Sequence, residues 1–319
     1  MNNRMKGFTL AELLVGLTLG ILVIGGATGV FLANQQTSKA NMVLSDMQNI
    51  ARLSFQLMSQ DIRNAGFSGC NNNARVANTI AIAGTRPAWA TWSVGAGIQG
   101  LAAPVGVING TNTTPATEAL RLMFGSGDSN AISNYDGSVF TLNITPVLAA
   151  GEVAVACDDS ESVIFQANEV DALTVTHQLA GLNADANLGF LPEIDWAPGL
   201  APPRIFSRNG MVMRFESIAW FVAPSNDDSE MNSLYRASLI GDAQINEEVL
   251  FGVSDLQFMY RNRDSGAFQT AAATTAAGQW GRINAVNVSV TLDDRIFNGQ
   301  EVPANAKTIR FLVALRNRL

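Results

Sequence analysis

Residues 6–15 read KGFTLAELLV and open the apolar run that decides the fold of this 319-residue chain. The run covers residues 8–33, and Glu12 is its only ionisable side chain. As a helix, a segment of this length extends about 39 Å, which is enough to cross a bilayer with some tilt. Arg4 and Lys6 precede the run, so the positive-inside rule places the N-terminus in the cytoplasm and the rest of the chain outside.

Glu12 is the unusual residue of this segment. A carboxylate inside hydrocarbon costs about 2–3 kcal/mol or more, and less near the interface. The side chain therefore either pairs with a cation or lies at headgroup level, and residue chemistry alone leaves both open. A secretory signal peptide is the alternative for the whole segment, but its apolar core spans only about 7–15 residues. The run here is longer, and Glu12 interrupts it near its start.

The stretch around Glu12 resembles the class III signal of type IV pilins and pseudopilins. The resemblance implies that a prepilin peptidase removes the leader 1–7 by cutting after Gly7, next to Lys6, and then N-methylates Phe8. It also implies that Glu12 pairs with the N-terminal amine of a neighbouring subunit. The physics agrees, because a methylated amine stays cationic and a buried carboxylate needs a cation.

The helix over 8–33 would cross the membrane and later lie in a filament core. It is predicted to continue as an amphipathic helix over 34–66. One apolar face with three- and four-residue spacing holds Leu44, Met47, Ala51, Phe55, Met58, Ile62 and Ala65. A second stripe holds Val43, Ile50, Leu53 and Leu57. Two faces indicate one for the globular domain and one for neighbouring subunits, or else a helix buried deeply in its own domain. Gly66 and Gly69 are expected to end the helix.

Residues 67–319 are predicted to form one β-rich globular domain. The expected strands are 118–124, 138–144, 152–157, 162–167, 172–177, 210–222, 233–240, 249–260, 283–292 and 308–315. Two stretches, 84–117 and 180–203, are interpreted as long loops, and 125–128 as a shorter one. No linker interrupts the strands, so the fold class is α+β: a long helical spine packed on an antiparallel β-rich domain, as in type IV pilins.

The composition excludes several classes of protein. A hydrophobic content of 47% is incompatible with a wholly disordered chain. The formal net charge is −7, from 20 Lys and Arg against 27 Asp and Glu. Direct nucleic-acid binding is therefore not expected, since the chain has no surplus of cations to displace counterions from phosphates.

Several blocks resemble one pilin subfamily, the PilW-type minor pilins. They are DIRNAGFSGC at 61–70, VAVACD at 153–158 followed by IFQ at 164–166, LYR at 234–236, LFGVSDLQFMY at 250–260 and VALRNR at 313–318. The resemblance is effectively full length. It implies a subunit that helps to prime filament assembly with other minor pilins, at or near the pilus tip.

The same resemblance implies the partners and the location. The partners would be prepilin peptidase, other minor pilins, the major pilin and a tip adhesin. The chain would lie in the inner membrane with a periplasmic globular domain before assembly, and at the pilus tip on the cell surface afterwards.

Cys70 and Cys157 are the only cysteines of the chain. They would face the oxidising periplasm, so a disulfide between them is expected. It would close a loop of 87 residues, for which the chain-entropy model gives roughly 4–5 kcal/mol of stabilisation. Two buried free thiols remain the alternative.

No catalytic site, metal site or cofactor is predicted. His177 is the only histidine, so it cannot build a histidine-rich metal site, and it is interpreted as a polar residue at a strand end. Asp227, Asp228 and Glu230 could bind calcium weakly, but they lack the alternating ligand order of an EF-hand, and a solvated turn is the preferred interpretation.

Two other functions stay open. A J-type pseudopilin of type II secretion has the same signal and fold, although the cysteine pair and the LRNR ending favour the pilus. A membrane-tethered periplasmic binding domain or enzyme would need a reactive pocket, for which the sequence offers no constellation.

Overall fold

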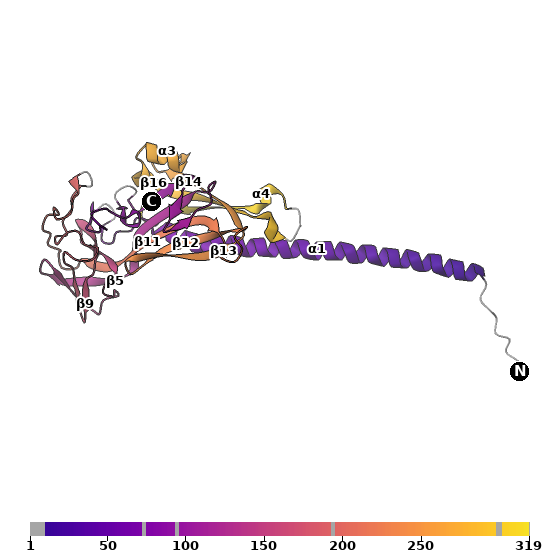
Figure 1. The fold of residues 1–319 in the computed structure, drawn as a ribbon, viewed down its shortest axis with the longest axis horizontal. Helices are drawn as coiled ribbons and strands as arrows, with labels where there is room; N and C mark the ends of the chain where they lie inside the picture. Colours follow the sequence, from indigo (N-terminus) through magenta and orange to yellow (C-terminus); the bar gives the residue numbers. More distant parts are fainter. Residues whose placement is uncertain (1–9, 72–74, 93–95, 193–194, 298–301, 319) are drawn as a thin grey trace.

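The computed structural model describes residues 10–71, 75–92, 96–192, 195–297 and 302–318. Its most prominent element is α1 (Leu10–Asn64), a helix of 55 residues that extends far beyond a β-rich body (Figure 1). The helix ends just before Gly66, whose φ of +79° is left-handed and suits glycine. The predicted fold class, a long N-terminal helix on a β-rich globular domain, is confirmed.

Within the described residues, the larger sheet contains eleven strands. They are β1 (Arg75–Asn78), β2 (Ile98–Leu101), β5 (Ala119–Tyr135), β6 (Val139–Leu142), β7 (Val153–Cys157), β8 (Glu161–Gln166), β9 (Glu169–Asp171), β10 (Thr174–Thr176), β11 (Met211–Pro224), β12 (Asn232–Ile240) and β13 (Ala243–Phe251). The main path runs β1-β8-β7-β11-β5-β6-β10-β9, and β12 and β13 branch from β11. The β1–β8 pair is parallel, whereas β11 pairs antiparallel with β5, β7 and β12.

A smaller antiparallel sheet lies beside α1 and has the order β15-β14-β16-β17. Its strands are β15 (Phe268–Gln269), β14 (Val253–Asn262), β16 (Ile283–Leu292) and β17 (Thr308–Ala314). A hairpin joins β3 (Val107–Ile108) to β4 (Thr111–Asn112). The short helices are α3 (Ala271–Ala276), α4 (Ala304–Lys307), η1 (Ala88–Ala90), η3 (Trp280–Arg282), η4 (Asp294–Phe297) and η5 (Arg316–Arg318).

The largest core forms where α1 meets both sheets. Met58 and Ile62 of α1 are fully buried there, in one cluster with Trp220 of β11, Tyr260 of β14 and Trp280 of η3. Burial of side chains of this size stabilises a fold by about 1.5–3 kcal/mol each. The C-terminal half of the helix is therefore part of the globular domain.

Three local predictions were wrong. The stretch 84–117 contains η1, β2, β3 and β4, although it was expected to be a loop. Residues 125–128 lie inside β5. There Gly125 leaves space that the Met213 side chain fills, opposite a register shift in β11, so this glycine marks a bulge and not a turn. The strand expected at 249–260 breaks at Gly252, which has φ +78°.

A buried polar cluster fastens α1 to the larger sheet. Asp61 is 7% exposed, and its Oδ2 accepts hydrogen bonds from Trp220 Nε1 at 3.0 Å and from Arg236 Nε at 2.9 Å. Arg236 Nη2 also donates to Oδ1 of Asp61 at 3.3 Å. The carboxylate therefore satisfies a buried indole N–H and a half-buried guanidinium together, which compensates for its own desolvation.

The C-terminal segment forms a second fastening. Arg318 Nη1 donates to the carbonyl of Trp280 at 2.7 Å, and Arg318 Nη2 donates to the carbonyl of Ala96. Asn317 Nδ2 approaches the carbonyl of Asn64, the last residue of α1, at 3.4 Å. Burial lowers the pKa of Arg318 to about 10. The end of the chain thus closes over the end of the helix.

Replacing Asp61 by Ala should lower the free energy of unfolding by about 3–5 kcal/mol, because Arg236 would keep a partly buried charge without its carboxylate. Asp61→Asn retains an acceptor for Trp220 and should cost less. Urea unfolding of the detergent-solubilised full chain, followed by tryptophan fluorescence, measures both. Asp128→Ala, which removes an exposed carboxylate from β5, is the matched control. An Asp61→Ala chain as stable as this control would show that the cluster is dispensable.

Candidate functional site

The N-terminal half of α1 lies outside the globular body (Figure 1). Within the described residues, α1 is the one helix long and apolar enough to cross a membrane, with an 18-residue window of mean hydropathy 2.2 of which none is buried. Leu10, Leu22 and Val23 are 79%, 70% and 70% exposed. An apolar surface of this size indicates contact with a bilayer or with apolar partners.

The residues predicted to be processed are placed only in part. Lys6, Gly7 and Phe8 lie outside the described residues, so peptidase cleavage and N-methylation stay predictions. Glu12 lies in the first described turn of α1 and is exposed. A carboxylate near a helix N-terminus is stabilised by the partial positive charge of the backbone N–H groups.

The C-terminal half of α1 has one buried face and one outer apolar stripe, but their members differ from the prediction. Val43 and Ile50, two members of the second predicted stripe, pack against the domain core. Leu44, which was predicted to share one face with Met58 and Ile62, is 55% exposed, whereas those two residues are fully buried. Leu53 and Leu57 do face outward, with 40% and 36% of their surface exposed. Sequence spacing gave two stripes but could not tell which one the domain would cover.

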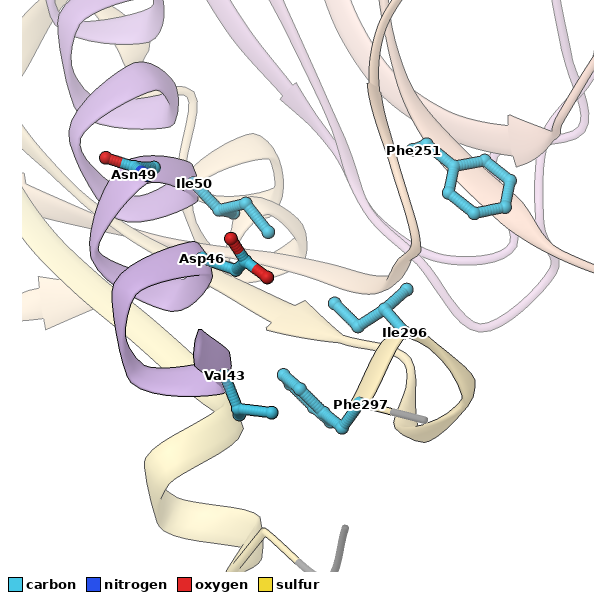
Figure 2. Close-up of a pocket in the computed structure, with 7 residues that line it drawn as sticks. All are labelled: Val43, Asp46, Asn49, Ile50, Phe251, Ile296 and Phe297. Atoms are coloured by element: carbon cyan, nitrogen blue, oxygen red, sulfur yellow. The ribbon is translucent and has the colours of Figure 1, made fainter. Parts of the chain in front are cut away.

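An apolar groove borders the helix where it enters the domain (Figure 2). Its volume is about 270 Å³, and it lies between α1 on one side and the β13 end with η4 on the other. The lining residues are Val43, Asp46, Asn49, Ile50, Phe251, Ile296 and Phe297. Apolar side chains dominate this set, and Asp46 and Asn49 add polar groups from the helix, so the groove could accept an apolar side chain beside a hydrogen-bond donor.

The sequence analysis missed the far wall of this groove. Phe251 ends β13, and Ile296 and Phe297 belong to η4, which begins at Asp294. The available signal was an apolar pair, Ile296 and Phe297, separated from two aspartates by one arginine, which is too short for a periodicity argument. It also missed Asp61, a charged residue at a position of the inner helix face, which could have been recognised as a buried polar anchor.

The two cysteines are joined in the structure. Cys70 and Cys157 form a disulfide with a Cα–Cα distance of 5.7 Å and a sequence separation of 87. Cys70 follows the end of α1, and Cys157 ends β7, a strand in the middle of the larger sheet. The bond therefore ties the segment that leaves the helix to the larger sheet.

The other chemical candidates do not assemble into a reactive site. Among the described residues, no group of three His, Cys, Asp or Glu could hold a metal ion. Asp227, Asp228 and Glu230 lie in an exposed turn between β11 and β12. His177 is 1% exposed within a cluster of rings, with its Nε2 2.8 Å from the hydroxyl of Tyr135.

The environment of His177 predicts a pH dependence of stability. Burial among Tyr135, Phe140 and Phe165 lowers its pKa to about 4, and the Asp136 carboxylate opposes this only in part. In the unfolded chain the pKa is about 6.5, so the unfolded state binds more protons between these values. The free energy of unfolding should have its full value above pH 6.5 and should fall by about 3 kcal/mol as the pH drops to 4.

Urea unfolding at a series of pH values measures this loss. The difference between the full chain and its His177→Phe variant isolates the imidazole from the carboxylates that titrate in the same range. If both chains lose the same stability between pH 6.5 and 4, the histidine is not the cause.

Comparison with known protein families bears on the N-terminal segment. Residues 2–28 match the prokaryotic N-terminal methylation motif. No curated protein matches the chain. The motif and the uncovered apolar helix that it overlaps indicate a membrane-anchored protein of the type IV pilin or pseudopilin kind, with a structural role that involves the pilus-type assembly components.

Proposed function

We propose that this chain is a PilW-type minor pilin that helps to initiate type IV pilus assembly. The observation that carries the proposal is the methylation motif at residues 2–28, which overlaps an apolar half-helix that the chain's own domain leaves uncovered. Such a helix is stable in a bilayer and can leave it only if other apolar surfaces replace the lipid. A bundle of like helices provides that replacement.

The proposed mechanism begins with processing. Prepilin peptidase would cut after Gly7 and methylate Phe8. Glu12 would then pair with the N-terminal amine of a neighbouring subunit, because a carboxylate carried into an apolar bundle needs a cation. The globular domain would stay in the periplasm while the helix moves from the inner membrane into the growing filament.

The PilW assignment is supported by what its sequence blocks do in the fold. The block at 61–70 supplies Asp61 of the polar cluster and Cys70 of the disulfide. The block at 313–318 supplies Arg318, which closes over the helix end. These blocks together hold the helix on the domain. By the same resemblance, the partners are other minor pilins, the major pilin and a tip adhesin, and the location after assembly is the pilus tip.

A J-type pseudopilin is the second candidate, because the methylation motif is common to pilins and pseudopilins. The two functions differ in where the processed chain ends up. A pilin enters surface filaments, whereas a pseudopilin remains in the cell envelope and serves protein secretion.

The first experiment is intact-mass measurement of the chain in filaments sheared from cells. We expect a mass that begins at methylated Phe8 and includes the Cys70–Cys157 disulfide. A processed chain found only in the membrane, together with lost protein secretion in its absence, would favour the pseudopilin. A chain that keeps residues 1–7 would contradict both functions.

Replacing Glu12 by Ala should reduce incorporation of the chain into sheared filaments by about tenfold or more, because the pairing that offsets burial of the terminal amine is lost. Unfolding of the globular domain should be unchanged, since Glu12 lies in the first turn of α1, at the end of the helix that extends away from the body (Figure 1). Asp171→Ala, at an exposed carboxylate of β9, is the matched control. Normal incorporation of Glu12→Ala would overturn the proposed role of this residue.

A further inference from the structure

The last turns of α1 carry arginines on one face. Arg52 lies eleven residues before Arg63, which is close to three helical turns, so both side chains leave the same side of the helix. Arg316 comes from η5, at the far end of the chain, and lines the same trough as Arg63. All three side chains are exposed. This arginine row (Arg52, Arg63 and Arg316) therefore gathers three guanidinium groups where the helix meets the C-terminal segment.

The trough between the helix and η5 has a volume of about 470 Å³. One wall is the ring of Phe55, which is held against Phe311 of β17 with the ring centroids 5.5 Å apart. A neighbouring hollow of about 320 Å³ shares Asn64 and Arg316 and continues toward β5. No carboxylate lines either hollow. The polar lining of the trough consists of amide, hydroxyl and guanidinium groups from Gln56, Ser59, Gln60, Arg63, Asn64 and Arg316.

The arginine row has no counter-charge in its own chain. No member of the row forms an ion pair with a residue that the structure describes. Other arginines of the chain do pair with carboxylates, for example Arg204 with Asp158 at 2.6 Å and Arg236 with Asp61 at 2.9 Å. On a protein of net charge −7, three uncompensated cations on one side of a helix end are a feature that the fold itself does not use.

The acid closest in sequence to the trough cannot supply the missing charge. Asp61 lies between Gln60 and Arg63 on α1, but it is 7% exposed and faces the domain. Its Oδ2 accepts hydrogen bonds from Trp220 Nε1 at 3.0 Å and from Arg236 Nε at 2.9 Å. This carboxylate is therefore fully engaged on the opposite side of the helix from the trough.

The densest acidic stretch of the described chain, residues 226–230, is also engaged where it lies. Glu230 N donates to Asp228 Oδ1 at 3.0 Å, and Arg295 Nη2 donates to the carbonyl of Glu230 at 2.7 Å. This loop thus has its own donors and its own cation. The anion that completes the arginine row must come from another molecule.

The helix dipole accounts for only part of the row. Arg63 lies in the last turn of α1, where the negative end of the dipole favours a cation. Arg52 lies three turns earlier and Arg316 belongs to another element, so neither is explained in this way. Guanidinium groups bind carboxylates through paired hydrogen bonds, and the amides of Gln56 and Gln60 can bond to a peptide backbone.

The dimensions of the site define the ligand. Arg52 and Arg63 are about 17 Å apart along the helix axis. An extended peptide covers that length with about five or six residues. A DNA duplex is a poorer match, because its binding rests on many phosphate contacts and the acidic body around the row repels a polyanion. Three cations beside a narrow trough favour a short acidic peptide.

We propose that the arginine row and the trough bind an extended acidic segment of a different subunit. One carboxylate of the segment reaches Arg52, and another lies between Arg63 and Arg316. The identity of the partner as another minor pilin rests on the proposed function, whereas the carboxylate chemistry rests on the trough. Because apolar helices pack alike in all subunits, such a contact lets this chain select one neighbour among several.

The first test measures binding to the purified full chain in detergent by fluorescence anisotropy. The probe is a fluorescent hexaglutamate peptide, and hexaglutamine is its neutral control. We expect hexaglutamate to bind, to weaken as salt is added, and to lose affinity by about tenfold or more in the variant with Arg63→Glu and Arg316→Glu. Equal binding of hexaglutamate to the native and reversed chains would overturn the proposal.

Three controls sharpen this measurement. Arg208→Glu reverses an exposed charge of another part of the surface and should leave hexaglutamate binding unchanged. Gln60→Glu adds a negative charge to the trough while keeping every arginine, so it should weaken binding even if the double variant fails to fold. A short DNA duplex that binds more tightly than hexaglutamate, and loses affinity in the same variants, would assign the row to nucleic acid and overturn the acidic-peptide proposal.

The second test locates the partner in cells that make filaments. A photo-crosslinking residue replaces Gln60, and mass spectrometry identifies the crosslinked segment. We expect a segment of a different subunit that contains at least two carboxylates close together in sequence. Reversing those carboxylates to lysine should abolish the crosslink, and combining them with Arg63→Glu and Arg316→Glu should restore it. A crosslink to a segment without carboxylates, or one that the reversed pair does not restore, overturns the proposal.

The two tests separate this inference from the proposed function. If the chain is present in sheared filaments but position 60 crosslinks to no acidic segment, the inference is wrong and the pilin function stands. If hexaglutamate binds through the arginine row but the chain never enters filaments, the minor-pilin partner is wrong and the proposed function fails with it.

Discussion

The structure depends on one constraint: within the part of the chain that the structure describes, the most apolar window of α1 is not buried by its own domain. The other half of the same helix contributes fully buried residues to the main core. Removing apolar surface from water is favourable by about 25 cal/mol for each Å². The exposed surface of the apolar half must therefore be covered by lipid or by other subunits. A single continuous helix thus belongs to two environments, and the domain must hold it through the half that it does cover.

The fastenings of that half are concentrated near the helix end. Asp61 binds Trp220 and Arg236, the C-terminal Arg318 closes over the turn at Gly66, and the Cys70–Cys157 disulfide follows at once. These contacts link the helix to strands far apart in sequence. A force applied to the apolar half along the helix axis would therefore be passed to both sheets and not to a flexible connection.

The sequence predicted the strong, local features and missed those set by tertiary packing. The apolar run, the glycine at the helix end and most strands were evident, because periodicity and turn residues report on each segment by itself. Which stripe of α1 the domain covers was not evident, since Val43 and Leu44 are both apolar and only η4 and β13 decide between them. Gly125 was interpreted as part of a loop, because the sequence does not show that the Met213 side chain occupies the space next to it. The cleavage and methylation predictions fall on residues outside the described part of the chain.

Apolar and charged surfaces have separate tasks in such a subunit. The helix and the groove at Val43 and Phe297 offer apolar area, which supplies binding energy without fixing a register, because one stretch of aliphatic side chains packs much like the next. Charges supply little binding energy but fix the register. An exposed ion pair contributes about 1 kcal/mol or less, whereas a contact between like charges is costly and disfavours every wrong register.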